Sequence, residues 1–225
     1  MTKIIAFEGI DGTGKTVQLQ RLSDRLAAEG KLHVQTISFP MYDTFFGAEC
    51  GRLLSGSGGV SANDVDGKSM ALWYALDRFE AFQHLDLSNA DVLLINRYVL
   101  SNAVYQSVRD RDLGKPDLLN FILELEYEHF RIPRADAHIV LDMNPEQAYE
   151  NVGKKGFREY VGDQPDIYEA LPDIQKRARQ KYIEYASRMP NIHIIPCMEQ
   201  NRLKSIADIG ALVDAIVGRV LCEAN

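Results

Sequence analysis

Five apolar runs alternate with longer segments of mixed polarity along this chain. They occupy residues 4–8, 33–38, 91–95, 137–142 and 192–196, and the segments between them are long enough for crossover helices. Apolar runs of this kind are typical of strands buried on both faces of a sheet. The pattern therefore predicts an α/β fold built on a five-stranded, mostly parallel sheet.

The carboxyl ends of these strands predict where a ligand binds. In a parallel sheet covered by helices, ligands collect in the crevice beyond those ends. Four segments fall there: the glycine-rich residues 9–16, Phe39-Pro40, Asn96-Arg97 and Asp142. We expect the functional site along this one rim.

Two later segments show helical spacing. Residues 66–88 are rich in aromatics around Asp77-Arg78, and a guanidinium in such surroundings needs a carboxylate, a ligand or solvent as its partner. In the last segment, apolar residues recur every three or four positions, which predicts a helix with one core-facing stripe. Its apolar positions are Leu203, Ile206, Ile209, Val213, Ile216, Val217 and Val220.

Residues 9–16 carry the most specific motif. They read Gly-Ile-Asp-Gly-Thr-Gly-Lys-Thr, which fits the GxxxxGK[ST] phosphate loop, and they follow the first apolar run directly. In such a loop, backbone N–H groups converge on the β- and γ-phosphates of ATP or GTP, the lysine adds positive charge, and the threonine hydroxyl reaches the phosphate-bound Mg²⁺. The expected nucleotide-binding residues are Gly9, Ile10, Asp11, Gly12, Thr13, Gly14, Lys15 and Thr16.

The context favours a phosphate loop over a glycine-rich turn that matches by chance. Val17, Leu19, Leu22 and Leu26 follow the motif at helical spacing, so the start of a helix would direct its partial positive charge at the phosphates. Strand, loop and helix in this order predict a three-layer α/β/α fold of the P-loop NTP hydrolase type.

Composition narrows the partners. The chain has 225 residues and no proline-rich or glycine/serine-rich linker, so residues 1–225 are expected to form one domain. A net charge of −7 makes nucleic acid or an anionic membrane a poor main partner. Cys50, Cys197 and Cys222 lack metal-ligand spacing, and no apolar segment approaches membrane-spanning length. We expect a soluble, cytoplasmic protein.

Residues 153–165 combine cations with glycines and a proline. The segment reads Gly-Lys-Lys-Gly-Phe-Arg-Glu-Tyr-Val-Gly-Asp-Gln-Pro. One interpretation is a solvated surface loop. The other is a lid that closes over the triphosphate and neutralises charge that develops during transfer. The sequence leaves both interpretations open.

Four segments, taken in order, resemble the thymidylate kinase family. They are the phosphate loop, Phe39-Pro40, Leu76-Asp77-Arg78 and the run 96–106, which reads Asn-Arg-Tyr-Val-Leu-Ser-Asn-Ala-Val-Tyr-Gln. The resemblance covers nearly the whole chain, from Phe7 to the helix of Tyr182. It implies transfer of the γ-phosphoryl group of ATP to the 5′-phosphate of thymidine monophosphate (dTMP), with Mg²⁺, in a homodimer.

The resemblance also implies how the acceptor is bound. Arg97 would bind its phosphate in line with the γ-phosphate. Tyr74 would stack on thymine, Arg78 would donate to O4, and Asn102 would complete recognition of the base edge. Tyr105, packed under the sugar, would exclude a 2′-hydroxyl. The other residues of the implied dTMP site are Asp11, Phe39, Pro40, Tyr42, Ser101 and Gln106.

Near the transferred group, the resemblance implies a set of catalytic residues. Asp11 would accept a hydrogen bond from the 3′-hydroxyl of the sugar, in company with Tyr42. Glu8 would lie close to the acceptor phosphate and to the waters bound to Mg²⁺. Thr16 would bind the Mg²⁺ ion directly. The implied catalytic set is Lys15, Arg97, Arg158, Glu8 and Asp11.

Some members of the family carry an arginine in the phosphate loop, and Gly12 stands in its place here. Cations of the lid would then replace it, Arg158 first and Lys154 and Lys155 after it. The turn at residues 197–201 is a candidate wall for adenine.

Two positions depart from the family's pattern. Its Asp-Arg-Tyr triplet reads Asn96-Arg97-Tyr98 here, and an amide is a weaker partner than a carboxylate for Mg²⁺ or its waters. We expect reduced rather than absent turnover, unless Glu8 or Asp11 takes over the outer shell of the metal. Met41 fills a place where many members have arginine, which would remove one contact to the acceptor phosphate.

Two other functions are compatible with the motifs. A deoxynucleoside kinase shares the phosphate loop but phosphorylates a hydroxyl, so it needs a carboxylate base, for which Glu8 and Asp11 are the candidates. A nucleotide-binding homologue with weakened catalysis would explain Asn96. The spacing of the motifs favours the thymidylate kinase interpretation over both.

Overall fold

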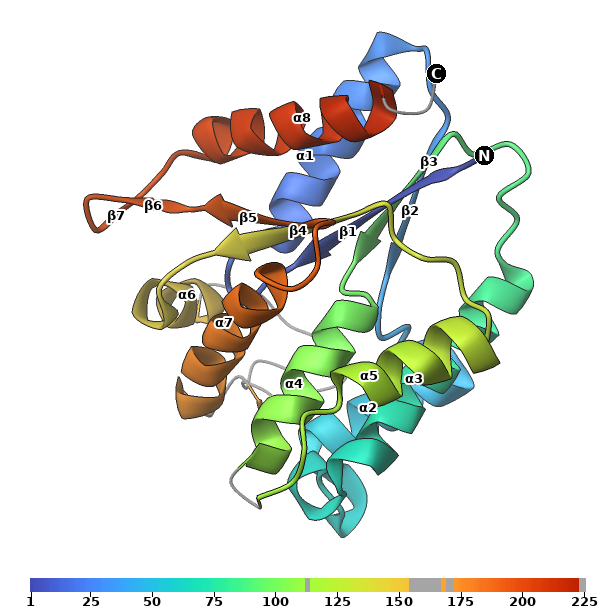
Figure 1. Ribbon diagram of the computed structural model, residues 1–225, viewed down its shortest axis with the longest axis vertical. Helices are drawn as coiled ribbons and strands as arrows, with labels where there is room; N and C mark the ends of the chain where they lie inside the picture. Colours follow the sequence, from blue (N-terminus) through green and yellow to red (C-terminus); the bar gives the residue numbers. More distant parts are fainter. Residues whose placement is uncertain (112–113, 154–166, 169–171, 223–225) are drawn as a thin grey trace.

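The computed structural model describes residues 1–111, 114–153, 167–168 and 172–222. Its centre is a parallel sheet of five strands in the order β2-β3-β1-β4-β5 (Figure 1). The expected fold class is confirmed. The strands are β1 (Lys3–Glu8), β2 (Val34–Ser38), β3 (Val92–Asn96), β4 (Ala137–Asp142) and β5 (Ile192–Pro196).

Strand β1 lies in the middle of the sheet, and both of its neighbours, β3 and β4, pair with it in parallel. Ile5 lies opposite Leu94 of β3 on one side and Ala137 of β4 on the other, and all three side chains are buried. The carboxyl ends of β1, β3 and β4 therefore meet at one edge, as the crossover pattern predicts.

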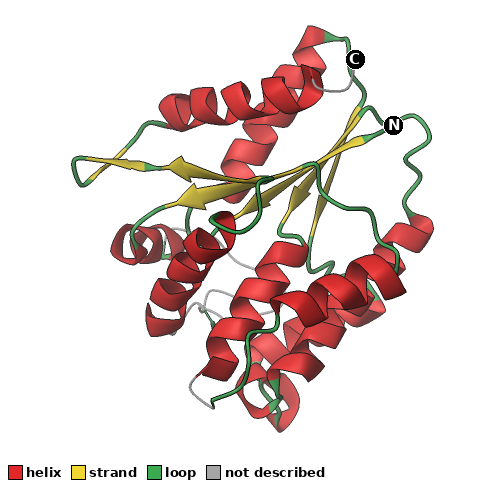
Figure 2. Ribbon diagram, in the orientation of Figure 1, coloured by secondary structure: helices red, strands yellow, loops and turns green. Residues whose placement is uncertain are grey.

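Helices cover both faces of the sheet (Figure 2). On one face lie α1 (Lys15–Glu29) and α8 (Ile206–Cys222), and on the other α4 (Val99–Arg111) and α7 (Pro172–Ala186) pack against each other. The remaining helices lie on the α4 side of the sheet: α2 (Phe45–Ser55), α3 (Gly67–His84), α5 (Leu119–Leu123), which runs into a π-helical turn (Glu124–His129), and α6 (Pro145–Val152).

Local chemistry sets where the site-bearing helices begin. Helix α1 starts after Gly14, whose φ of 86° suits glycine, and it ends at Gly30 with a φ of 65°. Helix α3 starts after Asp66, whose carboxylate accepts the N–H groups of Lys68 and Ser69. The start of α1 therefore places the phosphate loop directly before that helix. The start of α3 begins the helix that carries Asp77 and Arg78.

The C-terminal segment differs from the expected single helix. Leu203 lies in a small antiparallel hairpin of β6 (Met198–Glu199) and β7 (Arg202–Leu203), because Gln200 and Asn201 adopt φ values of 46° and 60° and reverse the chain. Helix α8 begins only at Ile206. Among the described residues, no helix combines the length and the apolar character that a membrane crossing requires.

Candidate functional site

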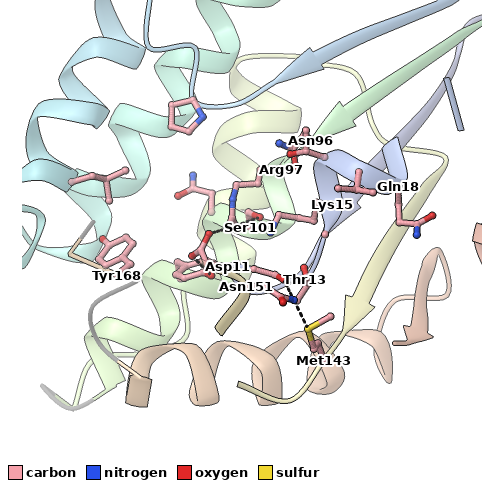
Figure 3. Close-up of a pocket in the computed structure, with 18 of the residues that line it drawn as sticks. Asp11, Thr13, Lys15, Gln18, Asn96, Arg97, Ser101, Met143, Asn151 and Tyr168 are labelled. Carbon is pink, nitrogen blue, oxygen red and sulfur yellow. Dashed lines mark hydrogen bonds and ion pairs between the residues drawn. The ribbon is translucent and has the colours of Figure 1, made fainter. Parts of the chain in front are cut away.

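A cavity of about 860 Å³ lies along the carboxyl ends of β1 and β3 (Figure 3). The phosphate loop, Asn96-Arg97 at the end of β3, and side chains of α3, α4 and α8 line it. The cavity therefore lies at the rim that the carboxyl ends of the strands predicted.

The glycines of the phosphate loop are required by its path. Gly9, Gly12 and Gly14 have φ values of 129°, 83° and 86°, which other residues rarely adopt. A Cβ atom on Gly12 would also lie 1.9 Å from the carbonyl oxygen of Ala148. The loop therefore runs tightly between β1 and α6, and only glycine fits at position 12.

Lys15 stands at the first turn of α1 and lines the cavity. Its Nζ donates to the carbonyl oxygens of Gly9 and Ile10 at 3.1 and 2.8 Å. These bonds hold the ammonium group over the loop, where the N-terminal end of the helix adds its own partial positive charge. The loop with Lys15 is thus built to bind an anion.

Arg97 brings a second positive charge to the cavity. It has a φ of 63°, and its guanidinium donates to Asp11 Oδ1 at 2.5 Å and to Ser101 Oγ at 3.3 Å. Burial by itself would lower the pKa of Arg97, but the carboxylate of Asp11 raises it well above the ordinary value. Tyr105 and Gln175 also hydrogen-bond Asp11, at 3.2 and 3.1 Å.

Arg78 and Asn102 form the far end of the cavity. Arg78 Nε and Nη2 donate to the two carboxylate oxygens of Glu126 at 2.5 and 2.6 Å, and both side chains are buried. The sequence required a partner for Arg78, and Glu126 of the π-helical turn is that partner. Asn102 Nδ2 donates to Glu126 Oε1 at 2.9 Å and to the carbonyl oxygen of Ala71 at 3.0 Å.

Two buried polar atoms at this end have no hydrogen-bond partner within the described part of the chain. They are Asn102 Oδ1 and Gln106 Nε2, one turn apart on α4, and both residues line the cavity. Their orientation follows from their other contacts, because Asn102 Nδ2 is committed to two acceptors, and Gln106 Oε1 accepts from Arg109 at 3.4 Å. A buried acceptor and a buried donor are therefore left for a ligand.

Several expected site residues lie behind the cavity rather than on it. Glu8 is completely buried and is not a lining residue, and Phe39 packs against Phe82 and Tyr98, while Pro40 and Tyr42 reach the wall. Arg158, Lys154 and Lys155, and with them nearly all of the expected lid at 153–165, fall outside the described residues. The lining residues from the expected list are Asp11, Gly12, Thr13, Gly14, Lys15, Thr16, Pro40, Tyr42, Tyr74, Arg78, Arg97, Ser101, Asn102, Tyr105 and Gln106.

The opposite end of the cavity reaches α8. Val17, Leu203, Lys204 and Ile206 line it there, whereas residues 197–201 are not among the described lining residues. The expected adenine wall at 197–201 therefore does not line this cavity, and the contact of adenine with the turn stays a prediction.

Comparison with known proteins decides the family. The profile of the thymidylate kinase family matches residues 7–205. The chain belongs to the thymidylate kinase family. It is 30% identical over 188 residues to a thymidylate kinase of Mycobacterium tuberculosis, which covers 82% of this chain and 86% of that one, and 31% identical over 206 residues to a probable thymidylate kinase of Sulfolobus acidocaldarius, covering 92% and 91%.

The fold agrees with this assignment. A solved thymidylate kinase structure from Candida albicans superposes with a TM-score of 0.72 at 21% identity and covers 97% of this chain and 92% of that one. As a member of the thymidylate kinase family, the protein is a nucleoside monophosphate kinase, and the sequence-based interpretation is confirmed over the two alternatives.

Sequence reasoning missed residues that support this kinase site from other elements. Gln175 of α7 connects Asp11, Tyr105 and the backbone of Tyr168, with four hydrogen bonds of 3.0–3.1 Å. Asn151 of α6 donates to the carbonyl oxygen of Gly12 at 3.0 Å. The only signal for Gln175 is its place on the otherwise apolar buried face of α7, between Ile174 and Ala178.

Asp77 of the kinase holds the turn that carries Pro40 and Tyr42 to the cavity. Its carboxylate accepts the N–H of Met41 at 3.2 Å and lies near the hydroxyl of Thr44 at 3.4 Å. Burial raises the pKa of Asp77 to about 6. These contacts therefore offset only part of the free-energy cost of burying the ionised carboxylate.

This raised pKa predicts a pH-dependent stability. The protonated form of Asp77 favours the folded state, so its contribution is complete below the unfolded value near 4 and is lost as the pH rises through about 6. Between pH 4.5 and pH 7.5, Asp77→Asn should remove about 2 kcal/mol of this pH dependence, given ~1.36 kcal/mol per pKa unit and the roughly 1.5 units between pH 4.5 and the folded-state pKa. Urea unfolding at pH 4.5 and pH 7.5 measures it, with the exposed Asp43→Asn as control. If the unfolding free energy changes equally between the two pH values in Asp77→Asn and wild type, the raised pKa of Asp77 is contradicted.

Proposed function

We propose that this kinase transfers the γ-phosphoryl group of ATP to the 5′-phosphate of dTMP, giving dTDP and ADP. The observation that carries the proposal is the buried, unpartnered pair of Asn102 Oδ1 and Gln106 Nε2 at the end of the cavity away from the phosphate loop. Thymine presents an N3–H donor between two carbonyl acceptors, which matches this acceptor and this donor.

The same contacts disfavour cytosine. Asn102 Oδ1 is the atom of this cavity residue that is left unpartnered among the described residues, because its amide nitrogen is held by Glu126 and Ala71. Cytosine has a lone pair at N3, so two acceptors would face each other in a buried site. Arg78 keeps its Nη1 for the O4 carbonyl, because only its Nε and Nη2 are bound to Glu126. Tyr74 lines the cavity as the stacking platform.

Arg97 is the proposed clamp for the acceptor phosphate. It lies between the base end of the cavity and the phosphate loop, and its planar fork of donors suits a phosphate. A phosphate there would compete with Asp11 for the guanidinium and free the Asp11 carboxylate for the 3′-hydroxyl, next to Tyr42. Tyr105, whose ring lies 5.4 Å from the guanidinium of Arg97, would pack under the deoxyribose.

Transfer then depends on alignment and charge. The acceptor phosphate oxygen attacks the γ-phosphorus in line with the departing ADP oxygen, and no residue has to remove a proton from a hydroxyl. Lys15 and the loop amides stabilise the charge that develops on the transferred group. Arg158 is proposed to add a cation from the lid. This scheme leaves Glu8 without a catalytic task, in agreement with its burial behind the cavity.

Mg²⁺ fits where Thr16 and Asn96 meet the cavity. Both residues line it, and Asn96 Oδ1 is buried without a hydrogen-bond partner in the described part of the chain. Mg²⁺ prefers oxygen ligands and keeps several waters, so Thr16 would bind the ion and Asn96 would accept a hydrogen bond from a bound water. When bound, the ion neutralises charge on the β- and γ-phosphate oxygens.

A deoxynucleoside kinase would need a different site. Its carboxylate base must face the cavity, yet Glu8 is buried behind it and Asp11 is paired with Arg97.

We also propose that the enzyme is cytoplasmic, where its buried free thiols Cys50 and Cys197 stay reduced, and that it forms a homodimer. Phe45 of α2 and Leu72 of α3, 67% and 39% exposed, offer an apolar surface for the dimer.

The test is ADP release from ATP and Mg²⁺ with a panel of acceptors. We expect dTMP to give the highest kcat/KM and dCMP a value lower by roughly 100-fold or more, because of the mismatch at Asn102. Thymidine itself should not be phosphorylated. Equal rates with dTMP, dCMP and dGMP would refute the proposed acceptor, and turnover of thymidine alone would favour a deoxynucleoside kinase.

A further inference from the structure

His138 is a polar side chain in an otherwise apolar part of the sheet. It lies in β4 next to β1, opposite Ala6, and is only 2% exposed. Its Nδ1 makes no hydrogen bond to any described residue, but it lies 3.6 Å from Oε1 of Glu8. Burying an imidazole without a polar partner costs free energy, and the carboxylate of Glu8 is the polar group near Nδ1.

Glu8 is the centre of a buried polar cluster between β1, α4 and α7. Its Oε1 accepts the backbone N–H of Tyr98 at 3.0 Å, and its Oε2 accepts from Ser101 Oγ and from Tyr182 OH, the latter at 3.3 Å. Burial by itself would raise the pKa of Glu8, but His138, Ser101 and Arg97 together lower it below the ordinary value. The carboxylate is therefore held ionised by its surroundings.

This cluster ends at Arg97. Tyr98, whose N–H Glu8 accepts, follows Arg97 directly, and Arg97 has the uncommon φ of 63°. Ser101 Oγ lies between the two charges, donating to Glu8 and accepting from Arg97 Nη1 at 3.3 Å. Glu8 thus fixes both the backbone after Arg97 and the hydroxyl beside its guanidinium.

We propose that His138 is a positioning residue for the acceptor phosphate, acting on Arg97 through Glu8 and Ser101. The imidazole lies against Oε1 of Glu8, whereas Ser101 and Tyr182 bind Oε2, so that the carboxylate stays in position to accept the N–H of Tyr98 after Arg97. The proposal rests on the proposed function in one respect, the role of Arg97 in binding the acceptor phosphate. A purely structural role would affect stability and leave acceptor binding unchanged.

The test compares His138→Leu with His138→Asn. Leucine has a similar volume and no polar atom, whereas the amide nitrogen of asparagine can take the place of Nδ1. We expect His138→Leu to weaken dTMP binding, measured by calorimetry, by about tenfold, the effect of losing one contact to a charged group. His138→Asn should stay within about threefold of wild type on the same scale. ATP affinity should change in neither variant, and KM for dTMP should rise more than kcat falls.

Unfolding temperatures of both variants separate positioning from stability. A lower unfolding temperature with unchanged dTMP affinity in His138→Leu would overturn the proposal, as would equal loss of dTMP affinity in the Leu and Asn variants. If wild type binds no dTMP, the proposed function fails instead. A crystal structure of His138→Leu then decides the positioning role, which predicts displaced Glu8 and Arg97 side chains and is refuted by an unchanged cluster.

Discussion

Replacing Lys15 by alanine is expected to lower kcat by roughly 10²–10³-fold, the loss typical of removing one group that stabilises transition-state charge. Lys15 Nζ is held over the phosphate loop by the carbonyl oxygens of Gly9 and Ile10. Without it, less positive charge is left in the cavity to balance the charge on the transferred phosphoryl group. Steady-state kinetics at saturating ATP and dTMP measure the effect.

The matched control for this loss is Lys31→Ala. Lys31 is an exposed lysine beyond the far end of α1, so its removal changes the net charge equally but leaves the cavity intact. Its kcat should equal that of wild type. A Lys15→Ala enzyme with near-normal kcat would show that the loop does not bind the transferred phosphates.

Glu126→Gln is expected to lower the free energy of unfolding by about 3–5 kcal/mol, the usual result of breaking a buried ion pair. The carboxylate binds Arg78 through both oxygens, and both side chains are at most 2% exposed. A glutamine places an N–H₂ group against the guanidinium, so one buried donor faces another. Chemical denaturation at pH 7.5 measures the change.

Glu124→Gln serves as the control because Glu124 lies in the same π-helical turn and its side chain is 69% exposed. It should leave the unfolding free energy within about 0.5 kcal/mol of wild type. Equal stability of the two variants would contradict the buried pair. In the Glu126 variant, dTMP binding should fall as well, since the one oxygen of glutamine cannot accept from both Arg78 Nε and the amide of Asn102.

The sequence was sufficient for the frame of the site because the relevant signals are local. Continuous apolar runs predicted the strands of the sheet, and the glycines at positions 9, 12 and 14 predicted a loop whose φ values only glycine adopts readily. The crossover connections predicted a parallel sheet, whose strands end at one edge, and this placed Arg97 and the loop on one rim. Asn102, Tyr105 and Gln106 on α4 came from the family resemblance of one continuous run.

The supporting contacts could not be predicted in the same way because they join distant parts of the chain. Arg78 needed a partner, but nothing in the sequence distinguished Glu126 from the other acidic residues of the segment 124–128. Gln175 reaches Asp11 across 164 positions, and His138 reaches Glu8 from a neighbouring strand. Each shows only as one polar residue on an apolar face, a signal that indicates burial without naming the partner.

Asn96 illustrates a different limit. The amide was expected to weaken metal binding, and the structure shows its Oδ1 buried and without a hydrogen-bond partner among the described residues. Such an atom suits a water of Mg²⁺, so the departure from the family's aspartate leaves an acceptor in place while it removes the charge. An acceptor oxygen therefore remains at position 96, but it attracts a cation less strongly than a carboxylate oxygen would.

A crystal structure with dTMP and a non-hydrolysable ATP analogue tests the central claim most directly. The account predicts thymine N3 within hydrogen-bonding distance of Asn102 Oδ1, the 5′-phosphate on Arg97, and the triphosphate on the loop with Lys15. A pyrimidine bound away from Asn102 and Gln106, or an Arg97 still paired with Asp11 and without a phosphate contact, would contradict it.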